Sequence, residues 1–387
     1  AGMAHGHYCK PDLEDLIELP PGSEVFTLPD RLPVGIDRTT GEVLLLAEDP
    51  HFPGRRISGA AAFMAPAHTS ILTAAYQRQE NAPLLPLFAY TAVGWHDGKF
   101  WAAGFRSDDD CRQDFSRFDQ PTIDRRTAKK LRQHRDNRLI QHLGTCCLTY
   151  SCPAARNYFL GRWEAPLPTS PGCNARCLGC ISLQPSECCP STQERLQFTP
   201  SVKEIVEVGA AHLENADRPV VSFGQGCEGE PLLQADLLGN SIREMRRRTD
   251  RGTINCNTNA SLPDDIGRLR EAGLDSIRVS LNSAREEFYH NYYRPQNYGF
   301  SEVKNSIKAM KKGGGFVSLN YFILPGFSDS EQETEALMKL IDETRPDFIQ
   351  LRNLNIDPEW YLGEIGSTAV SSALGIRNWL NKIRQSF

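Results

Sequence analysis

Several features that mark other classes of protein are missing from this chain of 387 residues. No apolar run reaches the length of a membrane-spanning helix, which excludes that class of protein. The formal net charge is −5, so no overall excess of basic residues points to nucleic acid. Residues 1–7 lack a charged segment followed by an apolar one, so they do not resemble a secretion signal, and we set them aside as a cloning remnant. These absences favour a cytoplasmic globular protein.

Cysteine is absent after Cys256, yet the chain up to and including that residue holds 12 cysteines. In a long chain without a secretion signal, this number favours metal or redox chemistry over disulfide bonds. Three of them, Cys173, Cys177 and Cys180, have the spacing Cys-x3-Cys-x2-Cys. A loop this compact lets three thiolates converge on one metal centre without a large loss of chain entropy.

The number of closely spaced cysteines indicates which kind of metal centre the loop could bind. Structural zinc sites and ordinary ferredoxin clusters take four protein ligands. Three local ligands therefore indicate a cluster in which one iron is left open for a ligand that is not protein. The alternative is a zinc or disulfide loop whose fourth partner is distant, for instance Cys188 or Cys189.

The N-terminal part of the chain predicts short β-strands. Asp97-Gly98 separates the strand-like residues 90–95 from 100–105, and an Asp-Gly pair in that place is the strongest short signal for a hairpin. We therefore expect a β-rich domain over residues 1–120, packed against the next domain. It contains no enzyme motif that we can name.

A basic segment and a group of cysteines follow. Residues 121–143 predict a helix rich in arginine and lysine, and a second basic run occupies residues 243–251. Most such runs are solvated helix faces, and the acidic overall charge agrees, so nucleic acid is not a favoured partner. The basic helix and the cysteines after it form a connector over residues 121–164.

From residue 165 the pattern becomes regular, because strand-like and helix-like segments alternate. Ser201 and Glu204 form a capping box that opens a helix, and Gly273 ends another. About six βα units fit into residues 165–355. Right-handed parallel crossovers would curl these units into an α/β fold, a partial (β/α)6 barrel of the TIM type. Residues 356–387 predict a closing amphipathic helix.

In such a barrel the chemistry takes place at the carboxyl ends of the strands. Unusual residues follow the predicted strands in order: the cysteine loop, Gly224–Pro231, Asn257–Ala260, Ser280 with Asn282, Asn320 with Pro325-Gly326, and Arg352-Asn353. Glycines let the backbone approach a ligand closely, and free carbonyl groups accept hydrogen bonds from an amine. A Gly-Glu pair beside a cluster loop therefore suits a ligand that carries an ammonium group.

Taken together, these stretches resemble the radical S-adenosylmethionine (SAM) superfamily over about residues 165–355. The resemblance is carried by the cysteine loop and by three further stretches: Glu228-Gly229-Glu230-Pro231, where the family has Gly-Gly-Glu, then Val279–Ser283, and Asn320–Gly326. Leu178 stands where the family often has an aromatic residue. The resemblance implies the partial barrel of radical SAM enzymes.

The resemblance also implies cofactors and their ligands. Cys173, Cys177 and Cys180 would hold a 4Fe–4S cluster, and SAM would chelate its open iron. The remaining SAM contacts that it implies are Glu228, Gly229, Glu230, Asn259, Ser280, Asn282 and Asn320. Glu228 replaces a family glycine, and we expect its carboxylate either to contact the SAM ammonium group or to face solvent. One electron would cleave SAM to a 5′-deoxyadenosyl radical that abstracts hydrogen from substrate.

The setting implied is anaerobic, with flavodoxin or ferredoxin as electron donor. The substrate, a small molecule or a peptide, stays unassigned. Because no cysteine follows Cys256, the C-terminal auxiliary-cluster domain of many peptide-modifying relatives is missing. A second iron–sulfur cluster would need upstream ligands, for which the candidates are Cys146, Cys147, Cys152, Cys188 and Cys189. The alternative is that several of these are buried, inert thiols.

Three other functions remain open at this point. The first is a radical SAM enzyme that modifies RNA, which the Gly-Glu-Pro stretch and the basic helices favour. The lack of a C-terminal cysteine for methyl transfer weighs against it. The second, from another class, is a non-catalytic iron–sulfur scaffold, sensor or electron carrier. The third is a zinc-binding interaction module.

Overall fold

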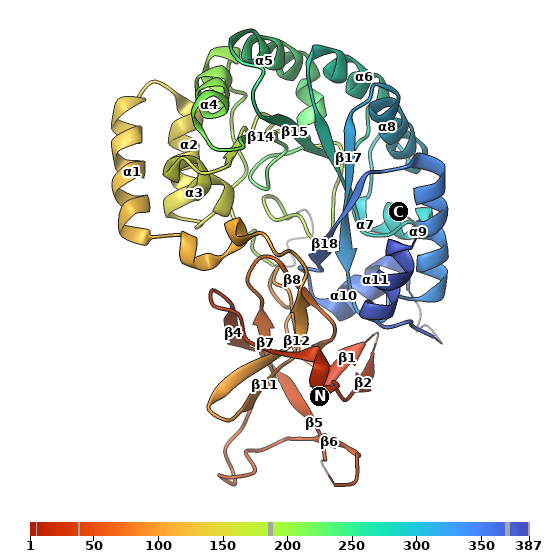
Figure 1. The fold of residues 1–387 in the computed structure, drawn as a ribbon. Coiled ribbons are helices and arrows are strands. Elements are labelled where there is room, and N and C mark those ends of the chain that lie inside the picture. Colours follow the sequence, from red (N-terminus) through yellow and green to blue (C-terminus); the bar gives the residue numbers. More distant parts are fainter. Residues whose placement is uncertain (5, 38, 185–188, 368–371, 386–387) are drawn as a thin grey trace.

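The computed structural model describes residues 1–387 except 5, 38, 185–188, 368–371 and 386–387. A curled six-stranded sheet forms its centre (Figure 1), and each pair of neighbouring strands is parallel. Its strands follow chain order: β13 (Glu164–Pro166), β14 (Val220–Phe223), β15 (Thr253–Thr258), β16 (Ser276–Leu281), β17 (Phe316–Ile323) and β18 (Phe348–Asn353). Strand order that matches chain order is what successive right-handed βα units produce.

Helices cover the outer face of this sheet (Figure 1). They are α4 (Val202–Asn215), α5 (Ala235–Arg248), α6 (Pro263–Ala272), α8 (Phe300–Lys312) and α9 (Glu331–Thr344). Between β16 and α8 the chain also forms α7 (Glu286–Tyr293), which the sequence pattern did not predict. The predicted partial (β/α)6 barrel is confirmed, and so is the capping box of Ser201 and Glu204 at the start of α4.

The alternation of buried apolar and half-buried polar residues along the strands distinguishes the outer face of the sheet from its inner face. In β16, Ile277, Val279 and Leu281 are buried and belong to the main apolar core that the sheet shares with the helices. Arg278 and Ser280 lie between them, half-buried, on the opposite, inner face. Because side chains alternate between the faces of a strand, the inner face of this sheet is polar.

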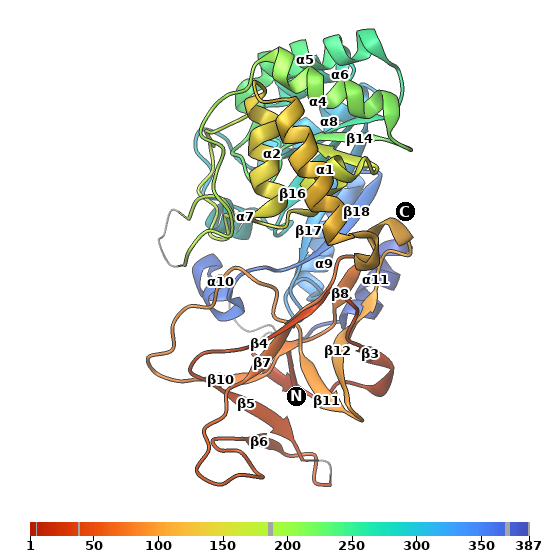
Figure 2. The ribbon, with the colours of Figure 1, turned by 90° about the vertical axis from the view of Figure 1, so that its left-hand side faces the viewer.

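The segment between the β-rich part and the barrel is more helical than predicted. Instead of one basic helix it forms α1 (Gln120–Gln133), α2 (Arg138–Leu148) and α3 (Pro153–Leu160). The break has a local cause, because the side chain of Asn137 accepts a hydrogen bond from the backbone of Ile140 and thereby caps a new helix. Figure 2 shows these helices beside α4.

The C-terminal residues form α10 (Pro358–Ile365) and α11 (Ile376–Arg384) rather than one long helix. Helix α11 is amphipathic, with Ile376, Trp379 and Ile383 buried. Part of the predicted closing helix, residues 368–371 and 386–387, lies outside the described residues. None of the described helices has both the length and the apolar character needed to cross a membrane.

The N-terminal part is rich in antiparallel strands, as expected. They are β1 (Gly2–Ala4), β2 (His7–Cys9), β3 (Leu16–Glu18), β4 (Glu24–Thr27), β5 (Arg31–Ile36), β6 (Val43–Leu45), β7 (Ala60–Phe63), β8 (His68–Ser70), β9 (Thr73–Ala74), β10 (Tyr76–Arg78), β11 (Val93–His96) and β12 (Lys99–Arg106). The predicted hairpin is β11–β12, and Asp97 and Gly98 both have positive φ, as a two-residue hairpin turn requires.

The β-rich part lies against the last strand of the barrel, where β8 approaches β18 (Figure 1). Asn353, at the end of β18, accepts a hydrogen bond from Ser70 and donates one to the carbonyl group of His68. Deeper in this junction, Arg31 forms a fully buried ion pair with Asp357, the residue that precedes α10. The predicted domain limits at residues 120, 164 and 355 stay predictions.

Candidate active site at the carboxyl ends of the strands

The cysteine loop follows β13 and is held by backbone hydrogen bonds rather than by secondary structure. The amide groups of Arg176 and Leu178 donate to the carbonyl groups of Tyr293 and Tyr292, at 2.9 and 3.0 Å. Leu178 is buried, while Cys173, Cys177 and Cys180 are only half-buried. The loop is thus fixed on α7 with its three thiol groups within reach of a ligand.

The surroundings of Cys173 and Cys177 disfavour free thiolate ions. Burial raises the pKa of Cys177 well above its ordinary value, and burial together with the charge of Glu230 raises the pKa of Cys173 to about 11. One cation lies close by, because Arg195 donates to Cys180 Sγ at 3.2 Å. Since metal ligands must lose their protons, binding a cationic centre here releases protons from these thiols.

The glycine-rich loop after β14 lies directly against the cysteine loop. The amide of Gly229 donates to the carbonyl group of Ser170 at 2.7 Å, and that of Glu230 donates to Gly172 at 2.9 Å. A Cβ atom on Gly229 would overlap the carbonyl oxygen of Gly172, so no side chain fits at this position. The absence of a side chain therefore allows the two loops to touch through their backbones.

Glu228 does not face solvent, which was one of the two expectations for it. The residue is only 5% exposed. One of its oxygens accepts hydrogen bonds from the backbone amides of Thr169 and Ser170, and the other from those of Gly224 and Gln225. With both oxygens used inside the protein, Glu228 joins the two loops, and this placement argues against a contact with the SAM ammonium group.

Glu230 and Asn259 also join loops. Glu230 accepts hydrogen bonds from the Thr258 hydroxyl group at 2.5 Å and from the Asn259 amide at 2.8 Å. The side chain of Asn259 then donates to that of Asn174, inside the cysteine loop, at 2.8 Å. Burial raises the pKa of Glu230 to about 7. The loops after β13, β14 and β15 are therefore linked into one unit.

The predicted residues of the fourth and fifth strands divide into two groups. Ser280 and Asn320 are register partners on the inner face of β16 and β17, and both are half-buried. Asn282 is fully buried and donates to the carbonyl group of Phe288 and to the hydroxyl group of Tyr361, on α7 and α10. Ser280 and Asn320 thus lie where a ligand could reach them, whereas the burial of Asn282 argues against its predicted contact with SAM.

The cysteine loop, the glycine-rich loop and the inner strand residues coincide with a known domain. The model of the radical SAM superfamily matches residues 167–338. Residues 167–338 therefore form a radical SAM domain. This domain uses a 4Fe–4S cluster and SAM, and two observations fit these cofactors: the three half-buried thiols on one loop, and the side-chain-free backbone of Gly229 beside them.

Curated relatives and solved structures were also found. A GTP 3′,8-cyclase of Paenarthrobacter nicotinovorans is 27% identical over 190 residues, which are 49% of this chain and 50% of that protein. A GTP 3′,8-cyclase of Vibrio atlanticus is 27% identical over 55% of this chain and 61% of that protein. The chain thus spans about half the length of the curated relatives it matches. A radical SAM methyltransferase from Sphaerobacter thermophilus has a TM-score of 0.38 and 17% identity, over 57% of this chain and 61% of that one.

Two arginines lie on the inner face of the radical SAM barrel: Arg352, noted from the sequence at the end of its strand but given no role, and Arg278, which was not noted. Arg278 donates to Asn257 Oδ1 at 2.7 Å and to Gln350 Oε1 at 2.6 Å. Arg352 lies on the same face of β18 as Gln350, with its guanidinium group 5.8 Å from the ring centre of Phe322. The signal for both was present in the sequence, since polar residues occupy every second position of these strands.

The candidate ligands for a second cluster have different surroundings. Cys147 lies near the Thr127 hydroxyl group, at 3.5 Å, and Cys152 is half-buried with its pKa raised by burial to about 11. Cys189 is half-buried, and Cys188 lies outside the described residues. Cys146 lies beside His142 and Cys227.

Proposed function

We propose that this radical SAM enzyme generates a 5′-deoxyadenosyl radical from SAM and uses it to abstract hydrogen from a substrate that carries an anionic group. The observation that carries the proposal is the joined loop unit, in which the cysteine loop, Gly229 and Glu230 are linked by backbone hydrogen bonds. When bound, the cluster supplies the electron that cleaves SAM. Cys173, Cys177 and Cys180 are its proposed ligands, and flavodoxin or ferredoxin is the proposed electron donor.

Other residues of the chain are proposed to bind the amino, carboxylate and ribose groups of SAM. The exposed backbone edge of the glycine-rich loop offers carbonyl groups to the amino group of SAM. Ser280 and Asn320, half-buried on the inner face, offer polar groups to its carboxylate and ribose. The joined loops keep these groups in fixed positions relative to the cysteines, which is how a protein aims a cofactor-derived radical at one atom.

The anionic substrate is inferred from the two inner-face arginines. No carboxylate of the described residues lies within ion-pair distance of Arg278 or Arg352, although many arginines elsewhere in the described chain are paired. Burial lowers the pKa of Arg278, an effect that the charge of Glu164 opposes and that of Arg352 increases. Two close cations without a carboxylate partner favour an anionic ligand. GTP, which the names of the curated relatives contain, is one candidate of this class.

The basic runs do not support RNA as that ligand. In α5, Arg246 forms an ion pair with Asp275, and Arg247 and Arg248 both lie near Glu244. Arg138, at the start of α2, pairs with Glu204. Since these arginines are neutralised within the chain, they offer less free charge to a phosphate backbone.

The radical reaction is tested by removing the three cysteines together. After anaerobic reconstitution, we expect the wild type to form 5′-deoxyadenosine from SAM and a strong reductant, and Cys173→Ala/Cys177→Ala/Cys180→Ala to form none. We also expect the variant to bind about four fewer irons per chain, because a 4Fe–4S cluster cannot be retained without its thiolates. The measurements are iron and sulfide content and product chromatography.

The matched control for the triple variant is Cys111→Ala, since Cys111 is exposed and far along the chain from the loop. It is expected to keep both cluster and activity. A cluster-loaded wild type that binds SAM but forms no 5′-deoxyadenosine, with or without GTP, would instead support the non-catalytic scaffold, sensor or electron carrier.

The anion site is tested by equilibrium dialysis with GTP, inorganic pyrophosphate and citrate. We expect at least one of them to bind the reconstituted wild type, and to bind Arg352→Gln about 10- to 150-fold more weakly, since a hydrogen bond to a charged group contributes about 1.5–3 kcal/mol. The control is Arg377→Gln, an exposed arginine of α11 that is paired with Asp15. Equal affinities for wild type and Arg352→Gln would contradict the anion site.

A further inference from the structure

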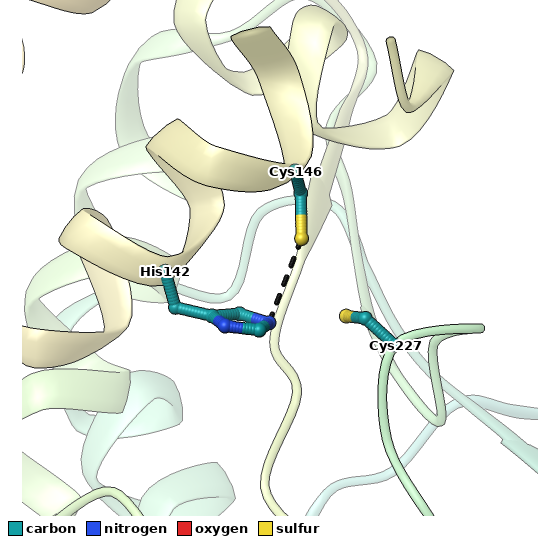
Figure 3. Close-up of side chains that lie close together, drawn as sticks. All are labelled: His142, Cys146 and Cys227. Atoms are coloured by element: carbon teal, nitrogen blue, oxygen red, sulfur yellow. Dashed lines mark hydrogen bonds between the residues drawn. The ribbon is translucent and has the colours of Figure 1, made fainter. Parts of the chain in front are cut away.

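His142, Cys146 and Cys227 form a group that the radical SAM chemistry does not use. His142 and Cys146 are one turn apart on α2, and Cys227 comes from the glycine-rich loop after β14 (Figure 3). Their side chains point toward one another, and Cys146 Sγ and Cys227 Sγ lie with a ring nitrogen of His142 within 4.8 Å of one another. Among the described residues, this is the only group of three or more such side chains gathered so closely.

We propose that His142, Cys146 and Cys227 bind a zinc ion. Two thiolates and one imidazole are donors that zinc prefers, and their spacing fits one ion. On a tetrahedral zinc ion, a sulfur at about 2.3 Å and a nitrogen at about 2.0 Å lie roughly 3.5 Å apart. The distance from Cys146 Sγ to His142 Nε2 is 3.5 Å.

The same spacing distinguishes this site from an iron–sulfur cluster. Ligands of a 4Fe–4S cluster bind different irons and are spread around it, whereas these three donors are close enough to surround one ion. Cys146 and Cys227 are 1% and 5% exposed, and His142 is half-buried, so the thiols are enclosed and the imidazole keeps partial contact with solvent. Three protein donors leave a fourth tetrahedral position for a small ligand.

The position of Cys227 gives this zinc a structural task. Cys227 directly precedes Glu228, whose carboxylate joins the glycine-rich loop to Thr169 and Ser170. A zinc ion bound to Cys227 and to α2 would therefore cross-link the glycine-rich loop to the helices that precede the barrel. Binding of zinc only in the folded state stabilises that state by mass action.

The first test is the metal content of the full chain. We expect about one zinc per chain in the wild type and in Cys173→Ala/Cys177→Ala/Cys180→Ala, and none in Cys146→Ser/Cys227→Ser, because thiolates are the main zinc donors here. The matched control is Cys147→Ser, the neighbouring buried cysteine on α2, which is expected to keep its zinc. X-ray absorption at the zinc edge should report two sulfur neighbours and one imidazole nitrogen.

A second measurement keeps the proposal testable if the double variant does not fold. Cobalt(II) added to the reduced, zinc-free triple variant should produce a visible absorption spectrum of tetrahedral thiolate coordination, and His142→Gln should change it. Chelation of zinc from the wild type should lower its melting temperature. A site that takes up iron instead, a disulfide bond between Cys146 and Cys227 in anaerobically prepared protein, or zinc retained by Cys146→Ser/Cys227→Ser would each overturn the proposal.

Discussion

Asp357→Ala is expected to lower the free energy of unfolding by about 3–5 kcal/mol, the usual cost of leaving one member of a buried ion pair without its partner. Arg31 Nη2 lies 2.9 Å from the Asp357 carboxylate, and neither side chain has any exposed surface. The same carboxylate accepts hydrogen bonds from the amide of Leu85 and from two amides at the start of α10. Alanine removes all of these contacts at once.

The loss of stability in Asp357→Ala should be largest where the β-rich part meets the barrel. Arg31 also donates to the carbonyl groups of Pro29 and Pro83, so its position is fixed by β-rich residues, whereas Asp357 belongs to the segment between β18 and α10. We therefore expect Asp357→Ala to expose the β-rich part to protease at lower urea concentration than the barrel. Pulse proteolysis across a urea series measures both.

Two variants control for this prediction. Glu18→Ala removes one partner of the Lys99–Glu18 pair, whose side chains are 55% and 57% exposed, and should cost less than about 1 kcal/mol. Asp357→Asn keeps an oxygen for Arg31 and Leu85 and should cost less than Asp357→Ala. If Asp357→Ala were as stable as Glu18→Ala, the buried pair would not be what holds the two parts together.

Gly229→Ala is expected to weaken SAM binding by about 5- to 150-fold, if the 1–3 kcal/mol that an overpacked methyl group usually costs falls on the loop that binds SAM. The new methyl group would overlap the carbonyl oxygen of Gly172, which is backbone and cannot rotate away. The cysteine loop must then move from the glycine-rich loop, and the hydrogen bond from the Glu230 amide to Gly172 is stretched. SAM affinity of the reconstituted protein is the measurement.

Gly267→Ala is the matched control, because it makes the same substitution where nothing lies within 4 Å of the added methyl group. Gly267 is in the interior of α6, where alanine is favoured over glycine by about 1 kcal/mol, so this variant should be unchanged or slightly more stable. An affinity of Gly229→Ala within twofold of that of Gly267→Ala would show that the contact between the two loops does not shape the SAM site.

Much of the fold was predictable because its signals are local. Alternating strand and helix segments gave the partial barrel, the Asp97-Gly98 pair gave the β11–β12 hairpin, and Ser201 with Glu204 gave the start of α4. The single basic helix was wrong. Its pattern of charge and apolar residues continues across the gap between α1 and α2, while the cap formed by Asn137 depends on one side chain.

Part of the candidate site was predictable for the same reason. Three cysteines in one short loop must lie near each other in any fold, and glycines that follow a strand identify a close backbone contact. The role of a polar side chain that could contact either the cofactor or the protein was harder to predict. The Glu228 carboxylate accepts hydrogen bonds from four backbone amides of two loops. No pattern along the chain predicts that those amides lie around it.

By itself, the sequence determined the family, the cysteine loop, the parallel barrel and the strand ends at which polar residues occur, because spacing and periodicity depend on neighbours along the chain. Only the tertiary structure decided that Arg278 and Arg352 share the inner face with no carboxylate of the described residues within ion-pair distance, and that His142 and Cys146 meet Cys227. The first of these arrangements depends on strand register. The second depends on how a helix packs beside a loop from a distant part of the chain. Both are set by the burial of the whole core, which no short stretch of sequence contains.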